Sequence, residues 1–349
     1  MLSDALRTID GLPPALPLAG GVVLLLLGGN WLVDGAVGIA RRLRLSPLLI
    51  GLTIVAFGTS APELFFNVAA ALSGHPELSF GNVVGSNIAN IALVLGLAAF
   101  LGPLAVSSRV LKRELPLLIG VSAVMLLLAW LGPAIIEGDL ARKGWGRADG
   151  LIMLGGFMLV TWAWYRMGRR DRADPLLAEA EAEARRERRL PVALAAVLFL
   201  LGLLALVAGG KLAELGAAGV AAWLGLSQTL IGLTVVALAT SLPEVVTSII
   251  ACRRGHIDLA VGNVVGSNLF NILLVLGATA AIASVPVPRD PLLFGIERGW
   301  GDLLVMLALT IILFPMAATS EQRIRRWEGA FLLLCYAGYI GLSIARELR

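Results

Sequence analysis

The chain alternates between long apolar stretches and short polar ones. Most apolar stretches hold 20 or more residues, enough for a helix to cross the hydrocarbon of a bilayer. None shows strand-like alternation, and backbone groups in lipid must be satisfied within the segment. The pattern predicts an all-α integral membrane protein with ten transmembrane helices, at 15–40, 46–73, 79–101, 115–136, 149–167, 190–222, 226–252, 259–285, 300–318 and 327–345.

Composition agrees with a membrane protein. Of 349 residues, 58% are hydrophobic and 15% charged, against about 25% charged in soluble domains. Cys252 and Cys335 match no metal or redox spacing. Basic residues do not cluster on a polar surface as they do in nucleic-acid-binding proteins. We therefore predict the lipid bilayer as the surroundings, no nucleic acid, no cofactor and no obligatory protein partner.

The most polar stretch, 166–190, divides the chain. We predict a first five-helix repeat over 1–165, a charged linker over 166–190 and a second repeat over 191–349. If the N-terminus lies outside, the inside loops carry 19 Lys and Arg residues and the outside regions 8. Because cytoplasmic loops are the basic ones, we expect an inner (plasma) membrane protein with both termini on the outer side.

Two parts of the chain repeat one another. Residues 51–99 and 232–280 align without a gap at a constant offset of 181, with 27 identities in 49 positions. The copies start five spans apart, and an odd separation inserts the second copy upside down. Inverted repeats place a shared site near the bilayer midplane. A duplication without function would leave apolar matches, whereas these matches are concentrated on Thr, Ser, Pro, Glu, Asn and Gly.

Glu63 and Glu244 are the most informative residues of the repeat. A carboxylate inside an apolar helix costs about 2.5–3.5 kcal/mol on insertion scales, so it is expected to have a function. Pro62 and Pro243 precede them, and a proline disturbs the carbonyl four residues earlier. Hydroxyls three and four residues before each glutamate share its side of the helix; these belong to Thr59, Ser60, Thr240 and Ser241.

The partner helix of each copy carries GNVVGSN. Ser86 and Asn90 are four residues apart, as are Ser267 and Asn271, so each pair projects to one face. The glycines of this motif form GxxxG pairs, which let helix backbones approach closely. Two carboxylates with hydroxyl and amide oxygens, and no thiol or imidazole, suit Ca²⁺ and Na⁺. Two carboxylates neutralise one Ca²⁺ or two Na⁺, so the ions compete for one set of ligands.

GTSAPE with GNVVGSNIAN, and ATSLPE with GNVVGSNLFN, resemble the two alpha-repeats of the sodium/calcium exchangers of the cation/Ca²⁺ antiporter superfamily, prokaryotic type. The resemblance implies Na⁺/Ca²⁺ exchange by alternating access, with the first and sixth spans as gating helices. It makes Glu63 and Glu244 the main Ca²⁺ ligands. The other ligands it implies are Thr59, Ser60, Ser86, Asn90, Thr240, Ser241, Ser267, Asn271 and the carbonyls of Ala56 and Ala237.

Three departures from related branches refine this expectation. The proton/Ca²⁺ branch carries a glutamate where this chain has Gly85 and Gly266, which favours sodium coupling. Asn271 replaces the acidic residue of the K⁺-dependent branch. The 166–190 linker is too short for a regulatory Ca²⁺-sensing domain. The alternatives are an H⁺/Ca²⁺ or Na⁺/H⁺ antiporter on the same scaffold and, from a different class, a membrane enzyme or structural protein; we find no nucleophile–base set or cofactor motif that an enzyme requires.

Overall fold

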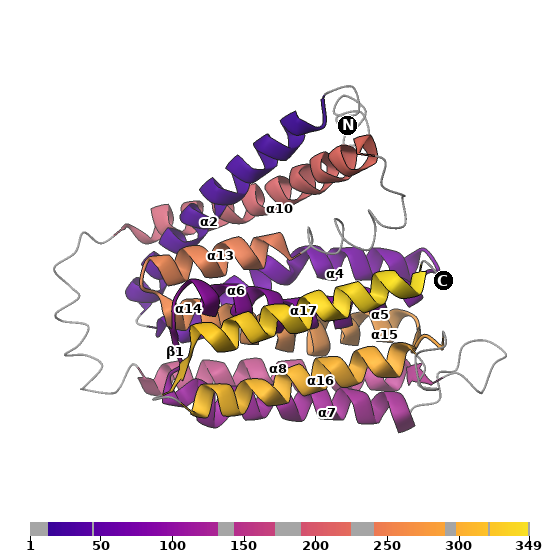
Figure 1. The fold of residues 1–349 in the computed structure, drawn as a ribbon. Helices are drawn as coiled ribbons and strands as arrows, with labels where there is room; N and C mark the ends of the chain where they lie inside the picture. The colour runs from indigo at the N-terminus through magenta and orange to yellow at the C-terminus, as the bar shows by residue number, and fades with distance from the viewer. Residues whose placement is uncertain are drawn as a thin grey trace.

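The structure, a computed structural model, describes residues 13–43, 45–131, 143–171, 190–224, 241–289, 298–319 and 322–347. This part of the chain is almost entirely helical (Figure 1). Nine of its helices are long and apolar enough to cross a membrane. They run Ala15–Leu43, Pro47–Leu72, Glu77–Leu101, Val110–Leu131, Arg147–Met167, Val192–Trp223, Ile257–Ile282, Arg298–Ala318 and Arg326–Ala345.

Several of these spans contain π-helical turns, which divide them into separate elements; most of the α-helices are labelled in Figure 1. The elements are α2 (Ala15–Leu43), α3 (Pro47–Ile50), η1 (Gly51–Val55), α4 (Ala56–Leu72), α5 (Glu77–Ala89), η2 (Asn90–Leu95), α6 (Gly96–Leu101), η3 (Val110–Glu114), α7 (Leu115–Leu131), α8 (Arg147–Asp171), α10 (Val192–Trp223), α13 (Leu242–Arg253), α14 (Ile257–Phe270), η6 (Asn271–Leu276), α15 (Gly277–Ile282), α16 (Arg298–Ala318) and α17 (Arg326–Glu347).

Nine of the ten predicted spans are confirmed. Of the remaining one, predicted over 226–252, the structure describes α13, while 225–240 lies outside the described residues. The predicted start of the fourth span at 115 is wrong, because the helix already begins at Val110. The intervening Lys112 and Arg113 are exposed, whereas Glu114 is buried and accepts a hydrogen bond from Trp164 Nε1 at 3.0 Å. Charged residues at this helix end therefore do not mark a loop.

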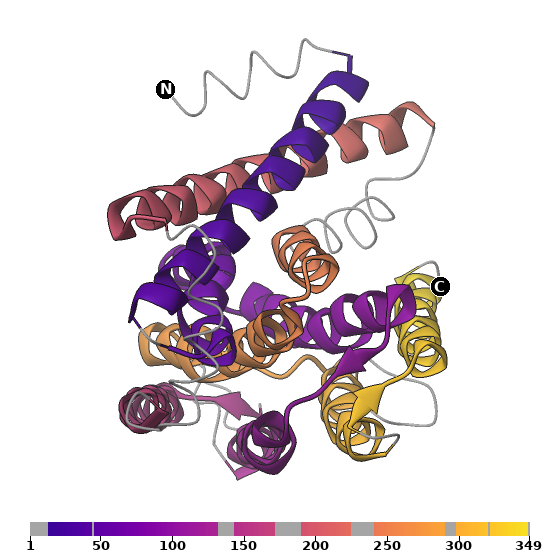
Figure 2. The same cartoon turned by 90° about the vertical axis from the view of Figure 1, so that its left-hand side faces the viewer.

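The helices α2 and α10 form a pair that lies at an angle to the other helices (Figures 1 and 2). Glycines recur every seven residues on both, at 21, 28 and 35 and at 202, 209 and 216. A methyl group on Gly28 would lie 2.8 Å from Gly202 O, and one on Gly202 would lie 2.7 Å from Gly28 O. The two backbones are in direct contact, as expected of membrane helices with small residues at the interface.

Two short antiparallel ladders join the loops. β1 (Leu104–Ala105) pairs with β4 (Arg323–Ile324), and β2 (Gly144–Trp145) pairs with β3 (Val285–Pro286). β1 and β3 occupy repeat-related positions at the offset of 181, so each ladder joins one strand from each half of the chain. The π-helical turns η2 and η6 are likewise 181 residues apart.

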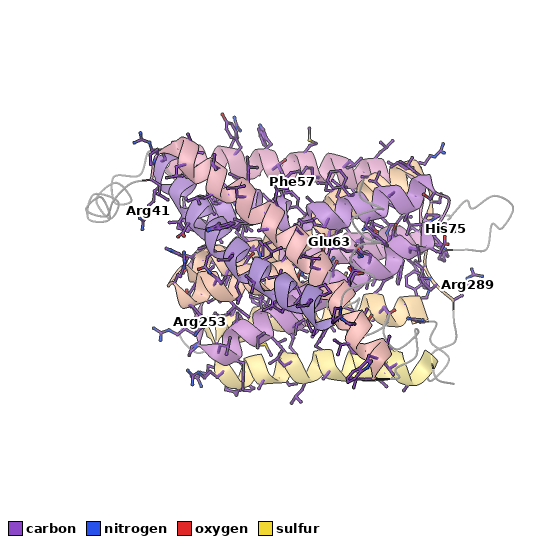
Figure 3. The ribbon with its side chains drawn as sticks, turned by 90° about the horizontal axis from the view of Figure 1, so that it is seen from above. Arg41, Phe57, Glu63, His75, Arg253 and Arg289 are labelled. Carbon is purple, nitrogen blue, oxygen red and sulfur yellow. The ribbon has the colours of Figure 1, made fainter. Side chains whose placement is uncertain are left out.

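The turns at the helix ends separate into two groups. Figure 3 shows Arg41 and Arg253 at one end of the bundle and His75 and Arg289 at the other. His75 follows α4, whereas Arg253 ends α13, the corresponding helix of the second copy. The two motif helices therefore end at opposite ends of the bundle, which is what oppositely inserted copies require.

Candidate ion-binding site

The two glutamates occupy different places in their helices. α4 continues through Pro62, so Glu63 lies within a helix whose hydrogen bonding is interrupted by the proline. α13 begins at Leu242 with Pro243 in its first turn, a position that tolerates proline. Glu244 therefore lies in the first turn of α13, where the helix dipole stabilises a negative charge.

Glycine contacts bring the two copies together. A methyl group on Gly51 of η1 would lie 2.5 Å from Leu259 O, and one on Gly266 of α14 would lie 2.7 Å from Leu52 O. Distances this short mean that the backbones of η1 and α14 touch. The glycines of GNVVGSN thus place the partner helix of the second copy directly against the glutamate helix of the first.

Glu63 and Glu244 come together at this contact. Their side chains are 3% and 2% exposed. The two carboxylates lie close enough for their charges to interact. Figure 3 shows Glu63 between the two ends of the bundle, far from the turns marked by Arg253 and His75. Two acidic groups from distant parts of the sequence therefore share one buried region.

Thr59 connects the two copies. Its hydroxyl donates toward Asn263 Oδ1 at 3.2 Å and lies 3.3 Å from Ser267 Oγ. Within its own helix it lies 3.4 Å from Ala56 O. The side chains of Thr59 and Ser267 are both buried. Predicted ligands of both copies are thus in hydrogen-bond contact.

The amide side chains make a second connection, between the GNVVGSN helices. Asn271 Nδ2 donates to Ser86 Oγ at 2.9 Å, and Asn90 Nδ2 donates to Asn268 Oδ1 at 3.0 Å. Each carboxamide nitrogen is therefore held by the opposite copy. The two carboxamide oxygens, Asn90 Oδ1 and Asn271 Oδ1, are buried and have no hydrogen-bond partner.

Unpartnered oxygen is the main chemical property of this site. Buried polar atoms nearly always have a partner, so each exception requires an explanation. Five of the predicted ligands carry a buried oxygen without one in the structure: Ser60 Oγ, Glu63 Oε2, Asn90 Oδ1, Glu244 Oε2 and Asn271 Oδ1. Carboxylate, hydroxyl and amide oxygens are the ligands of hard cations such as Ca²⁺. The arrangement is chemically suited to hold such an ion.

Two of the twelve predicted residues, Ala237 and Thr240, lie outside the described residues. The other ten are described. Ser241 is buried at the residue preceding α13, and Ala56 is buried at the start of α4. The assignment of all twelve as ligands stays a prediction.

Sequence reasoning missed the asparagines that lie one turn away from the predicted ligands. Asn67 Nδ2 donates to Glu63 O at 2.6 Å and to Asn82 Oδ1 at 2.7 Å. Asn263, the counterpart of Asn82 in the second copy, contacts Thr59 and Ser248. The identity of Asn82 and Asn263 at the repeat offset was a usable signal, because asparagine is costly in an apolar helix. The π-helical turns beginning at Asn90 and Asn271 had no such signal.

Other polar groups lie apart from this site. His75 is exposed beside Glu77, and Lys211 pairs with Glu214 on its own helix at 2.8 Å. Arg254 follows α13 and pairs with Asp34 of α2 at 2.5 Å.

Comparison with known proteins identifies the family. The profile of the family described as sodium/calcium exchanger protein matches residues 14–166 and 194–345. The chain belongs to the sodium/calcium exchanger family. The matched residues lie on either side of the charged linker and include both copies of the motif. This exchanger-family chain is thus a multi-pass membrane protein from a group of cation/Ca²⁺ antiporters, which are transporters rather than enzymes.

Individual relatives agree with this assignment along nearly the whole exchanger-family chain. CaxA of Alkalimonas amylolytica, a candidate antiporter, is 42% identical over 91% of this chain and 95% of its own length. The sodium/calcium exchanger MaX1 of Methanosarcina acetivorans is 33% identical over 92% of this chain and 95% of its own. The solved structure of the sodium-calcium exchanger NCX_Mj, soaked with Na⁺ and Ca²⁺, matches with a TM-score of 0.75 and 28% identity, covering 94% of this chain and 97% of that one.

Proposed function

We propose that this chain exchanges Na⁺ for Ca²⁺ across the membrane at the site between α4, α5, α13 and α14. The observation that carries the proposal is the group of five unpartnered buried oxygens on Ser60, Glu63, Asn90, Glu244 and Asn271. They come from both copies of the repeat and include both carboxylates. In lipid, such a group is costly, and a bound cation would supply the missing interactions.

The same two carboxylates support exchange. One Ca²⁺ or two Na⁺ neutralise them, and further Na⁺ would need only neutral oxygens. An empty site with two negative charges is costly in a low-dielectric interior. The protein should therefore switch between its inward-open and outward-open states mainly when ions are bound. Binding of Na⁺ then requires release of Ca²⁺, and alternating access at a midplane site in an inverted repeat follows.

Sodium is the coupling ion that we favour over the proton. Gly85 and Gly266 occupy the positions at which the proton-coupled branch is expected to carry glutamate. The relative MaX1 and the solved structure NCX_Mj are both named as sodium/calcium exchangers. An H⁺/Ca²⁺ antiporter on the same scaffold is the competing function, and the coupling experiment separates the two.

Everted membrane vesicles test the coupling. Uptake of radiolabelled Ca²⁺ should follow an imposed Na⁺ gradient and continue after an ionophore collapses the proton gradient. Vesicles carrying Glu63→Gln or Glu244→Gln protein in equal amount should take up no Ca²⁺, because each change removes one of the two charges that neutralise the ion. Uptake that follows the proton gradient without Na⁺ would contradict sodium coupling. Full uptake by both variants would contradict the site.

A further inference from the structure

Asn263 belongs to the second copy of the GNVVGSN motif, at 262–268, but is not one of the predicted ligands. It lies four residues before Ser267 on α14, on the same face, and its side chain is fully buried. Its oxygen Oδ1 is 3.2 Å from Thr59 Oγ1, and its nitrogen Nδ2 donates to Ser248 Oγ at 3.3 Å. The carboxamide therefore bridges α4 of the first copy and α13 of the second.

The contact with Thr59 determines where one proton goes. A threonine hydroxyl has a single proton and two lone pairs. Around Thr59 Oγ1, the acceptors within reach are Asn263 Oδ1 at 3.2 Å, Ser267 Oγ at 3.3 Å and the carbonyl of Ala56 at 3.4 Å. A proton directed to Ala56 or Ser267 would occupy an oxygen that the cation needs. A proton directed to Asn263 leaves those oxygens and the Thr59 lone pairs available.

Ser248 fixes which end of the Asn263 carboxamide faces Thr59. A reversed carboxamide would point its NH₂ group at the Thr59 hydroxyl and would draw on the lone pairs that a cation needs. Because Nδ2 donates to Ser248, the oxygen is turned toward Thr59. In the first copy, Asn67 corresponds to Ser248 and Asn82 to Asn263. The same two helices are connected there, but Asn67 Nδ2 is the donor and Asn82 Oδ1 the acceptor.

We propose that Asn263 is a positioning residue that accepts the Thr59 proton and so turns the Thr59 oxygen toward the transported ion. The proposal rests on the proposed function of the site. Asn263 itself does not contact the ion. Its effect on ion binding depends on the Thr59 hydroxyl, whereas an effect through packing would not. The two roles can therefore be distinguished by experiment.

A double-mutant cycle on purified protein, read by Ca²⁺ binding and by its competition with Na⁺, tests this role. Thr59→Val removes the hydroxyl, and Asn263→Leu removes the acceptor with little change of volume. We expect each to raise the dissociation constant for Ca²⁺ on the order of tenfold. The double variant should bind like Thr59→Val alone, because contacting residues that act through one group are not additive. Additive losses, or no loss in Asn263→Leu, would overturn the proposal.

A second variant keeps the test independent of whether Asn263→Leu folds. Ser248→Val retains Asn263 but removes the atom that orients it, so it should weaken binding in the parent and have no further effect in Thr59→Val protein. A further loss in that background would count against the proposal. Thr279→Val is the matched control, because Thr279 is a buried threonine whose hydroxyl donates to Val275 O of its own span at 2.7 Å. Binding by this variant should equal that of the parent.

The same experiment separates the two levels of inference. If Glu63→Gln and Glu244→Gln proteins bind Ca²⁺ as the parent does, the proposed site itself is wrong. If those variants lose binding while the Thr59 and Asn263 losses add, the site stands and only the role of Asn263 is rejected.

Discussion

Ser60 and Ser122 provide a comparison at the scale of single residues. Both are buried, and both have a hydroxyl oxygen without a partner. Ser60 lies one helical turn before Glu63, whereas Ser122 lies in α7, away from the paired carboxylates. A buried hydroxyl without a partner costs stability. Removing either hydroxyl should therefore have the same effect on stability, and only a hydroxyl that binds the ion should also affect ion binding.

We predict that Ser60→Ala weakens Ca²⁺ binding about tenfold, or ~1.4 kcal/mol, because a ligand oxygen is lost. Ser122→Ala should leave binding unchanged and should not lower the melting temperature, since it removes an unsatisfied group. Calorimetric titration of the two purified variants checks both statements. Equal binding by both alanine variants would mean that the Ser60 hydroxyl faces no ion.

How far single residues could be predicted depended on the periodicity of the helix. Glu63 and Ser60 were accessible from spacing and from the cost of polar atoms in lipid. Asn263 was not singled out, because sequence spacing assigns a residue to a face of its own helix but not to a partner on another helix. Its contact with Thr59, 204 residues earlier in the chain, depends on the packing of η1 against α14.

At the scale of helices, the adjacent glycines 20 and 21 of α2 have different surroundings. A methyl group on Gly20 would meet no atom within 4 Å, whereas one on Gly21 would lie 2.4 Å from the backbone nitrogen of Ala213. Only Gly21 belongs to the glycine interface between α2 and α10.

We predict that Gly21→Ala destabilises the protein by about 1–3 kcal/mol, as overpacking does, because two helix backbones must separate. Gly20→Ala should be neutral or stabilising by up to about 1 kcal/mol, since alanine is the better helix former. Thermal unfolding of the two variants in the same detergent measures the difference. Equal melting temperatures would show that the α2–α10 contact contributes little to stability.

Helix positions were largely predictable from hydropathy, but helix pairing was not. The predicted span 300–318 and the observed Arg298–Ala318 differ by two residues at one end. The fourth span begins at Val110, five residues before the predicted start. The prediction excluded Lys112, Arg113 and Glu114 because they are charged, but in the helix the first two are exposed and Glu114 is buried. Hydropathy is averaged over a window of residues, so it does not distinguish an exposed charged side chain from a buried one within a single helical turn.

At the scale of the whole molecule, the position of basic residues predicts which end of the bundle faces the cytoplasm. Arg41 and Arg253 lie at the opposite end from Arg289 (Figure 3). In the sequence-based assignment the end with Arg41 is cytoplasmic. Labelling in cells tests which end of the bundle faces the cytoplasm.

We predict that a cysteine replacing Arg289 reacts with a membrane-impermeant maleimide added to intact cells, whereas one replacing Arg41 reacts only after the cells are opened. Both changes are made in protein whose natural Cys252 and Cys335 are replaced by alanine. Labelling is read by mass shift on a gel. Reaction of the Arg41→Cys protein alone in intact cells would reverse the predicted orientation.

The constant offset between the halves has an evolutionary consequence. The offset is 181 from Gly21 and Gly202 through the π-helical turns to β1 and β3, whereas β2 and β4 are 179 residues apart (323 minus 144). One inserted residue rotates everything after it by about 100° around a helix with 3.6 residues per turn, which would turn a ligand away from its partners. From Gly21 onward, the differences in length between the halves therefore lie after β1 and β3, in the connections beyond the candidate ion site.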